Sequence, residues 1–212
     1  MEVAFCDNHL LVLIKPSGLS TQPHQGESDN LIDRGKMWLK RTFSKNGNVF
    51  LEPIHRLDKP VKGFVLCART SKALSRLQEQ MRQREIWKTY YAWVEGVLPE
   101  GSAVLEHYLT HGNHRAHSVS KGHPEGKLAR LSYTTLEKAE GKTFVEIALE
   151  TGRYHQIRAQ FSAIGAPIIG DKKYGSCLSW KSEGIALCHG KLAFKHPVTK
   201  EPLEFSIPQK HL

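Results

Sequence analysis

The stretch Gly63-Phe-Val-Leu-Cys-Ala-Arg-Thr-Ser71, with the helix-like pattern that follows it, decides the class of fold. Its first six residues form a continuous apolar run, which is typical of a buried strand. Either of its last two residues can cap a helix. Leu74, Leu77 and Met81 then recur at spacings of three and four, which is the spacing of one helix face. This order predicts a strand followed by a helix that packs on the sheet.

The patterns on both sides of this stretch predict a fold in which strands dominate and a few helices cover the sheet. Predicted strands span residues 10–14, 86–95, 128–137 and 142–150, with further strand and turn between 185 and 205. A helix is predicted to follow Asp29 or Asn30, either of which can cap it. Residues 19–30 and 107–127 are predicted as loops. The chain is therefore expected to be α+β.

A last helix is predicted near residue 154. Helical spacing connects Tyr154, Ile157, Phe161 and Ile164. Gly165 is a natural residue to follow a helix, and Pro167 prevents its continuation. This places His155 and Arg158 together on another face, near the start of the helix.

Length and composition predict a single cytoplasmic domain over residues 1–212. A chain of 212 residues has the size of one domain, since domains commonly have ~100–200 residues. The longest apolar run, Leu10–Ile14, is far shorter than the ~20 residues that a membrane span needs, so no membrane partner is expected. The N-terminus has neither the basic region nor the long apolar region of a secretory signal.

The cysteines are predicted to be reduced thiols that pack as small hydrophobic residues. They are Cys6, Cys67, Cys177 and Cys188. They form no C-x-x-C pair, and a chain of this length does not need disulfides to be stable.

The charge of the chain makes polyanions plausible partners. Lys and Arg number 30 against 21 Asp and Glu, which gives a net charge of +9 with the 12 histidines uncounted. Such an excess attracts nucleic acid through counterion release, although a merely solubilising surface explains it equally well. Five histidines between His107 and His123 lie near no cysteine or carboxylate cluster at metal-site spacing, so a solvated or RNA-facing loop is favoured and no metal is expected.

Among the acidic residues, Asp58 has the most unusual neighbours in the sequence. It lies between prolines 53 and 60 and is flanked by Arg56, Lys59 and Lys62. These cations would keep its pKa low and the carboxylate ionised, as a nucleophile requires. From these residues alone, an ordinary surface cluster of ion pairs is the favoured alternative.

Six motifs in order resemble those of the RluA family of RNA pseudouridine synthases and cover nearly the whole chain. They are Lys15-Pro16-x-Gly18, His55-Arg-Leu-Asp58, Lys88-Thr-Tyr90 with Glu95-Gly96, Thr151-Gly-Arg-x-His-Gln-Ile-Arg158, Gly170-Asp-x-x-Tyr-Gly175 and His196-Pro197. A tetrapeptide alone is a weak signal, whereas six ordered matches are a strong one. The resemblance implies the family's catalytic fold, with a mixed, largely antiparallel sheet and an active-site cleft.

The resemblance also implies a cofactor-free isomerisation of uridine in RNA, in which the base is detached from C1′, rotated and rejoined through C5. Asp58 matches the catalytic aspartate, Tyr90 the tyrosine that packs on the target base, and Arg158 the arginine that pairs with the aspartate. The target base must be flipped out, and Arg56 matches the arginine that can fill the vacated stack. The sequence leaves open whether Asp58 attacks C1′, adds to C6 or takes a proton from C2′.

Further residues of these motifs are expected to act as scaffolding or as contacts to RNA. They are His55, Arg153, His155 and Gln156. The motif around Gly170 is interpreted as structural. The chain departs from the family where Val61-Lys62-Gly63 replaces a frequent Thr-Ser-Gly, which affects loop detail and RNA selectivity. It also begins directly with the catalytic domain, so that the S4 RNA-binding domain of many relatives is expected to be missing.

Two alternatives compete with the synthase interpretation. An RNA N-glycosidase would share the detachment step, but it needs a second acid to activate water, and none lies in the motifs around Asp58. A non-catalytic RNA-binding protein or chaperone on the same fold would not need the set of Asp58, Tyr90 and Arg158. The expected partner is RNA, either tRNA or rRNA, with no obligate protein partner and a monomer as the default.

Overall fold

The structure, a computed structural model, describes residues 1–23, 28–180 and 183–208. The chain divides into two compact units, each with its own strands and helices. Unit 1 consists of Met1–Lys88 and His189–Pro208, and unit 2 of Thr89–Cys188. The single domain over 1–212 stays a prediction. Part of the loop predicted over residues 19–30, namely 24–27, lies outside the described residues.

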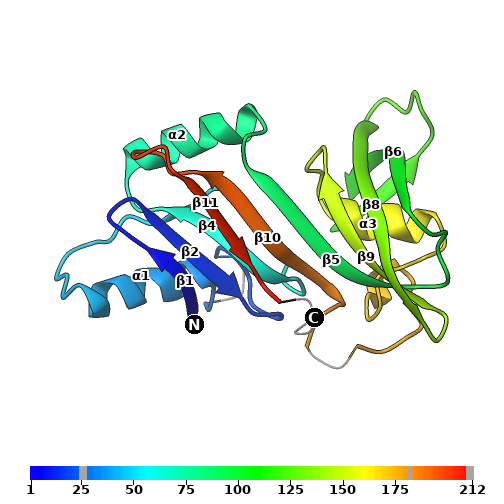
Figure 1. Cartoon of the computed structure of the whole chain (residues 1–212), viewed down its shortest axis with the longest axis horizontal. Helices are drawn as coiled ribbons and strands as arrows, with labels where there is room; N and C mark the ends of the chain where they lie inside the picture. Colours follow the sequence, from blue (N-terminus) through cyan, green and yellow to red (C-terminus); the bar gives the residue numbers. More distant parts are fainter. Residues whose placement is uncertain (24–27, 181–182, 209–212) are drawn as a thin grey trace. The chain divides into compact units, whose positions relative to one another are not determined.

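Unit 1 is built on strands from both ends of the chain (Figure 1). Its strands are β1 (Glu2–Cys6), β2 (Leu10–Lys15), β3 (Glu52–Pro53), β4 (Lys62–Ala68), β11 (Pro202–Ser206) and most of β10 (Leu187–Lys195). They follow the order β1-β2-β4-β10, with β11 against β10 and β3 against β4. The pairs β1–β2, β2–β4, β3–β4 and β10–β11 are antiparallel. The strands predicted at 10–14 and 63–68 are confirmed, whereas β1 was not predicted.

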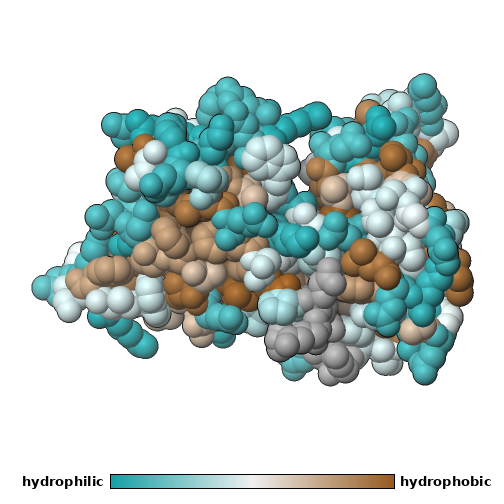
Figure 2. All heavy atoms as spheres, viewed as in Figure 1, coloured by the Kyte–Doolittle hydropathy of each residue, from teal (hydrophilic) through white to brown (hydrophobic). Residues whose placement is uncertain are grey.

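Four phenylalanine rings, one each from β1, β4, β10 and β11, pack together in unit 1. The ring of Phe205 on β11 lies 5.8 Å from Phe5, 6.1 Å from Phe64 and 6.2 Å from Phe194. Hydrophobic residues also gather over the strands of this unit in Figure 2. The C-terminal hairpin is therefore part of the apolar packing of unit 1, although it is far from β1 and β4 in the sequence.

Two helices of unit 1 begin at the predicted caps. Helix α1 (Leu31–Thr42) starts after Asn30, whose side chain accepts a hydrogen bond from the backbone N–H of Asp33 at 2.9 Å. Helix α2 (Ser71–Arg82) starts after Thr70, whose hydroxyl accepts from the N–H of Ala73 at 3.1 Å. Such caps satisfy backbone donors that a helix leaves unpaired. The two helix starts could be predicted because capping is local.

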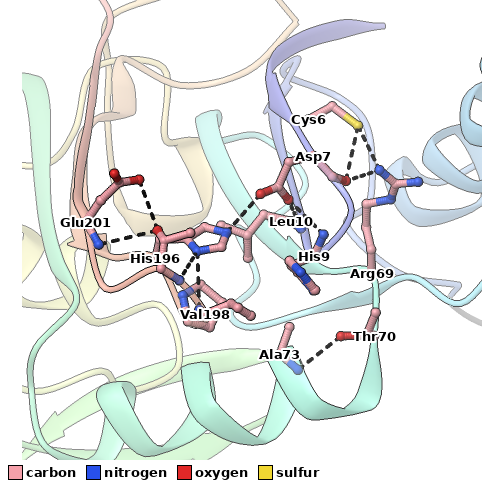
Figure 3. A network of polar contacts seen from close by, with 12 residues as sticks. Cys6, Asp7, His9, Leu10, Arg69, Thr70, Ala73, His196, Val198 and Glu201 are labelled. Atoms are coloured by element: carbon pink, nitrogen blue, oxygen red, sulfur yellow. Dashed lines mark hydrogen bonds and ion pairs between the residues drawn. The ribbon is translucent and has the colours of Figure 1, made fainter.

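A polar network joins the β1–β2 turn to the turn between β10 and β11 (Figure 3). The Asp7 carboxylate accepts hydrogen bonds from the backbone N–H groups of His9 and Leu10 at 2.8 and 2.7 Å. His196 donates to the same carboxylate through Nε2 at 2.8 Å, and its Nδ1 accepts from the N–H of Thr199 at 2.9 Å. Burial alone would raise the pKa of Asp7, but these hydrogen bonds lower it below its ordinary value.

Unit 2 contains a run of antiparallel strands and one α-helix. Its elements are most of β5 (Trp87–Glu95), then β6 (Ser102–Gly112), β7 (Arg115–Val119), β8 (Lys127–Ala139), β9 (Lys142–Leu149), α3 (Gln156–Ala163) and the 3₁₀ turn η1 (Lys172–Tyr174). The strand order is β5-β9-β8-β6-β7. One cluster of its core consists of Leu109, Ala116, Ala129, Ala159 and Tyr174. The α+β class is confirmed.

The loop predicted over residues 107–127 is wrong for most of its length. Strands β6 and β7 form a hairpin there, with Thr110 opposite His117 and Gly112 opposite Arg115. The histidines that suggested a loop are mostly exposed, while Leu109 and Ala116 point into the core. A strand with one solvent-exposed face tolerates polar residues, so composition alone could not reveal it.

The four cysteines are free thiols, but only Cys67 and Cys188 are buried. Cys177 is exposed and Cys6 is half-buried, so the predicted burial of all four is wrong for these two. Within residues 1–23, 28–180 and 183–208, none of the helices is long and apolar enough to cross a membrane.

Candidate active site

Asp58 lies on a loop between β3 and β4 that buried polar groups hold in place. The hydroxyl of Thr21 donates to the carbonyl of Leu57 at 2.9 Å and accepts from the N–H of the same residue at 3.1 Å. The backbone carbonyl of Asp58 accepts from the N–H of Val61 at 3.0 Å, which closes a tight turn. The Asp58 side chain itself is half-buried. The loop is thus fixed on both sides of the aspartate.

A buried lysine holds the other side of this loop. The side chain of Lys15 is completely buried, and its ammonium donates to the carbonyl oxygens of Pro16 (3.0 Å), Leu19 (2.7 Å) and Lys59 (3.0 Å). Burial lowers the pKa of Lys15 to about 8, and the charge of Asp58 opposes this shift. Lys15 belongs to the first family motif, but the sequence does not predict its burial, because its acceptors are backbone carbonyls that carry no sequence signal.

The loop also contributes His55 to a pair of neutral histidines, His55 and His189. The Nε2 atom of His55 accepts a hydrogen bond from the N–H of Leu66 at 3.3 Å, and its ring meets the ring of His189 at 5.2 Å. Burial lowers the pKa of His55 well below its ordinary value, and the charges of His189 and Lys88 add to this effect. Burial also lowers the pKa of His189 to about 3. The contacts of His55 are thus within the fold, and its contact to RNA stays a prediction.

The glycine five residues after Asp58 has a steric role. Gly63 has φ +129°, and a Cβ atom built there would lie 2.3 Å from the backbone oxygen of His189. Only glycine adopts this positive φ without strain and, lacking a Cβ atom, leaves room for the backbone of His189. The departure at Val61 and Lys62 therefore keeps the one residue of the Thr-Ser-Gly pattern that the backbone requires.

Arg158 and Asp171 form a buried ion pair in unit 2. Nε of Arg158 lies 2.6 Å from Oδ2 of Asp171, Nη2 lies 2.9 Å from Oδ1, and the two side chains are 5% and 1% exposed. The guanidinium also lies 4.9 Å from the ring centre of Tyr174. The sequence did not predict Asp171 as a partner, although the motif around Gly170 contains both Asp171 and Tyr174. That motif is thus linked to Arg158.

The residues before Arg158 are held by hydrogen bonds to the sheet. The amide oxygen of Gln156 accepts from the hydroxyl of Thr151 at 2.8 Å and from the N–H of Arg153 at 2.9 Å. Its amide nitrogen donates to the carbonyl of Arg130 at 3.1 Å. Arg153 is exposed and donates to the carbonyl of Leu128 at 2.9 Å. Gln156 therefore acts as scaffolding, and contacts of these residues to RNA stay predictions.

Tyr90 lies on β5 opposite Ile147 of β9 and is 7% exposed. Tyr91 next to it is 1% exposed and stacks on Phe144, with ring centres 5.9 Å apart. The two neighbours are thus both buried, and β5 has packing on both faces.

The predicted functional residues fall in two groups, with His55, Arg56 and Asp58 in unit 1 and the others in unit 2. Their meeting in one site stays a prediction.

The comparison with protein families identifies the class. Residues 9–163 match the model of the RNA pseudouridylate synthase family. Among the part of the chain that the structure describes, no group of three or more His, Cys, Asp or Glu side chains could hold a metal ion. The chain belongs to the family of RNA pseudouridine synthases.

Curated relatives are similar over nearly the whole chain. The chain is 35% identical to the dual-specificity RNA pseudouridine synthase RluA of Pasteurella multocida, covering 98% of this chain and 93% of the relative. It is 31% identical to the uncharacterized RNA pseudouridine synthase YlyB of Bacillus subtilis, covering 98% and 69%. It is also 31% identical to the ribosomal large subunit pseudouridine synthase D of Xanthomonas campestris, of which it spans 66%.

A solved structure supports the fold. The human protein RNA pseudouridylate synthase domain containing 4 superimposes with a TM-score of 0.80 at 21% sequence identity. The match covers 99% of this chain and 89% of the human chain. The pseudouridine synthase fold that the motifs implied is thus confirmed.

Proposed function

We propose that this chain isomerises specific uridines in structured RNA to pseudouridine, with Asp58 as the catalytic group and without a cofactor. The observation that carries this proposal is the way in which unit 1 holds Asp58. Thr21 and Lys15 fix the backbone on both sides of a half-buried carboxylate. Such rigidity is expected of a group that must meet one atom of a flipped nucleotide, and membership of the family supports it.

Arg158 and Tyr90 are proposed to complete the site. The bidentate ion pair with Asp171 fixes the plane of the Arg158 guanidinium through Nε and Nη2, so that its other N–H groups would donate to Asp58 in a set orientation. These hydrogen bonds would favour the ionised form of Asp58 when RNA covers the site and excludes water. Tyr90 would pack on the target base. Arg56 is exposed and would fill the place that the flipped base leaves in the stack.

The substrate is proposed to be rRNA or tRNA, and the protein a cytoplasmic monomer without an obligate protein partner. Relatives are named as synthases of the large ribosomal subunit and as a dual-specificity RNA synthase. The net charge of +9 fits a polyanionic substrate. Four free cysteines fit a reducing compartment.

The test is pseudouridine mapping across cellular RNA from a strain that lacks the gene, complemented with wild type, Asp58→Asn or Asp29→Asn. Asp29 is an exposed aspartate paired with Arg34, so its substitution is a matched control. We expect a site that disappears in the deletion strain and returns with wild type and with Asp29→Asn, but not with Asp58→Asn. Restoration by Asp58→Asn would refute the catalytic assignment.

The same variants separate the alternatives. Purified protein is incubated with RNA transcripts labelled in the uracil ring, and both pseudouridine and free uracil are measured. Release of uracil without pseudouridine would indicate an N-glycosidase. RNA binding with neither product, and with no change in any strain, would indicate a non-catalytic RNA-binding protein.

A further inference from the structure

Four aromatic rings of unit 2 form a continuous series from the core to the surface. Tyr174 is buried, and its ring centre lies 5.7 Å from that of His155. His155 stacks on Tyr154 with ring centres 3.9 Å apart and planes at 17°. The ring of Tyr154 in turn contacts the ring of His111 on β6, with ring centres 4.2 Å apart. Tyr154 is 40% exposed and His111 is also exposed, so the series ends in solvent.

Hydrogen bonds fix these rings before any ligand arrives. Nδ1 of His155 lies 3.0 Å from the hydroxyl of Tyr174. Burial lowers the pKa of His155 to about 3, with smaller effects of the Arg158 and Lys173 charges, so the ring is neutral and can accept this bond. The hydroxyl of Tyr154 donates to the carbonyl of His114 at 3.4 Å. A surface that is already ordered loses little conformational entropy when it binds.

Tyr154 was predicted to lie on the apolar face of α3, and this prediction is wrong. The helix begins only at Gln156, after His155 in the left-handed region with φ 49°. Tyr154 therefore precedes the helix and turns toward the β6–β7 hairpin, where it meets His111. A large ring kept in solvent by a strained backbone position indicates a binding role more than a packing role.

Cations surround the exposed end of the series. The ammonium of Lys173 donates to the carbonyl of His114 at 3.2 Å, which is the same carbonyl that Tyr154 contacts. Arg153, next to Tyr154 in the sequence, is exposed. At the buried end, Arg115 lies over the ring of Tyr174 at 4.8 Å. Of the nearby acids, Asp171 is buried in its ion pair with Arg158 and Glu150 is paired with Arg130.

We propose that Tyr154 and His111 form a stacking site for an unpaired base of the RNA substrate other than the target uridine, with Arg153 and Lys173 contacting the adjacent phosphates. Aromatic rings offer a face on which any base can stack, and nearby cations neutralise the phosphates that accompany it. A protein partner with an apolar surface would leave these cations without counter-charges. The inference rests on the RNA-modifying function proposed above and adds a recognition element to it.

The test measures binding of the full chain to a fluorescein-labelled RNA hairpin with a loop of seven uridines, by fluorescence anisotropy. Tyr154→Leu, which removes the ring, is expected to weaken binding about 5- to 150-fold, the effect of losing one stacked base. Tyr154→Phe keeps the ring and is expected to bind within about twofold of wild type. Phe50→Leu, which removes an exposed ring of unit 1, is the matched control and is expected to bind like wild type.

A second RNA and a second measurement make the test decisive. A blunt duplex of the same length has no unpaired base, so Tyr154→Leu is expected to bind it like wild type. If Tyr154→Leu does not fold, wild-type protein is irradiated with the hairpin carrying 5-iodouridine in its loop, and cross-links are expected on Tyr154 or His111. Equal binding by Tyr154→Leu and wild type, or cross-links only elsewhere, would overturn the stacking site alone. Failure of wild type to bind either RNA would instead refute the proposed function.

Discussion

Thr21 offers a sharp test of how the Asp58 loop is held. Thr21→Val keeps the shape of the side chain but removes both hydrogen bonds to Leu57, at 2.9 and 3.1 Å. Thr21 and Leu57 are both buried, so water cannot replace the lost hydroxyl. A buried backbone group without a partner costs about 1–3 kcal/mol, and the valine methyl returns part of that through apolar burial. We expect the free energy of unfolding to fall by about 2–4 kcal/mol.

The rate of reaction is expected to fall with stability, because a loop that has lost these bonds no longer fixes Asp58. The assays are equilibrium unfolding in urea, followed by circular dichroism, and single-turnover formation of pseudouridine at saturating enzyme. We expect a rate at least about tenfold lower at a temperature where the variant is folded. Thr134→Val is the control, since Thr134 bonds Ser102 at 2.8 Å on an exposed surface. Wild-type stability and rate in Thr21→Val would refute the argument.

Two further predictions concern buried ionisable groups. Asp171→Ala leaves the Arg158 guanidinium buried without its bidentate partner, so we expect about 3–5 kcal/mol less stability in urea, and an unchanged midpoint would contradict this. The pKa of His189 is about 3 in the fold against an ordinary 6.5, so its contribution to stability is complete above pH 6.5 and is lost as the pH falls toward 3. From pH 7.5 to pH 5 His189 alone accounts for a loss of about 2 kcal/mol. The lowered pKa values of His55 and His155 add to this loss in the same direction, and urea unfolding at both pH values measures the total. A protein equally stable at both would refute the neutral, buried assignment.

Local signals in the sequence predicted much of the fold. Caps at Asn30 and Thr70 and the apolar run at 63–68 were found because a cap or a strand is set by neighbouring residues. The β6–β7 hairpin was missed because only one of its faces is apolar and the other carries histidines. Tyr154 was misassigned because helical spacing continued past the point where the backbone turns at His155.

The candidate site was predictable in its residues but not in its supports. Asp58 was identified by its motif, whereas the buried ammonium of Lys15 acts on backbone carbonyls that any residue supplies. The pair of Arg158 with Asp171 joins positions 13 residues apart through a turn whose geometry the sequence does not specify. Sequence patterns indicate the type of a residue and its neighbours along the chain. The hydrogen bonds of Lys15 and the ion pair of Arg158 depend instead on which groups lie nearby in the folded structure.

Unit 1 consists of segments from both ends of the chain, and this affects the order in which the protein can fold during synthesis. Among the described residues unit 2 is one continuous segment, Thr89–Cys188, so all of it is synthesised before residues 189–208 of unit 1. These last residues, which form β11 and most of β10, bring His196 to Asp7, 189 residues earlier. Because chains fold as they emerge, at about 5–20 residues per second, unit 1 waits several seconds for its final pieces. Unit 1, which carries Asp58, is therefore the last part of the enzyme to be completed, although the hydrogen bonds that hold the Asp58 loop join residues 15–61 and can form earlier.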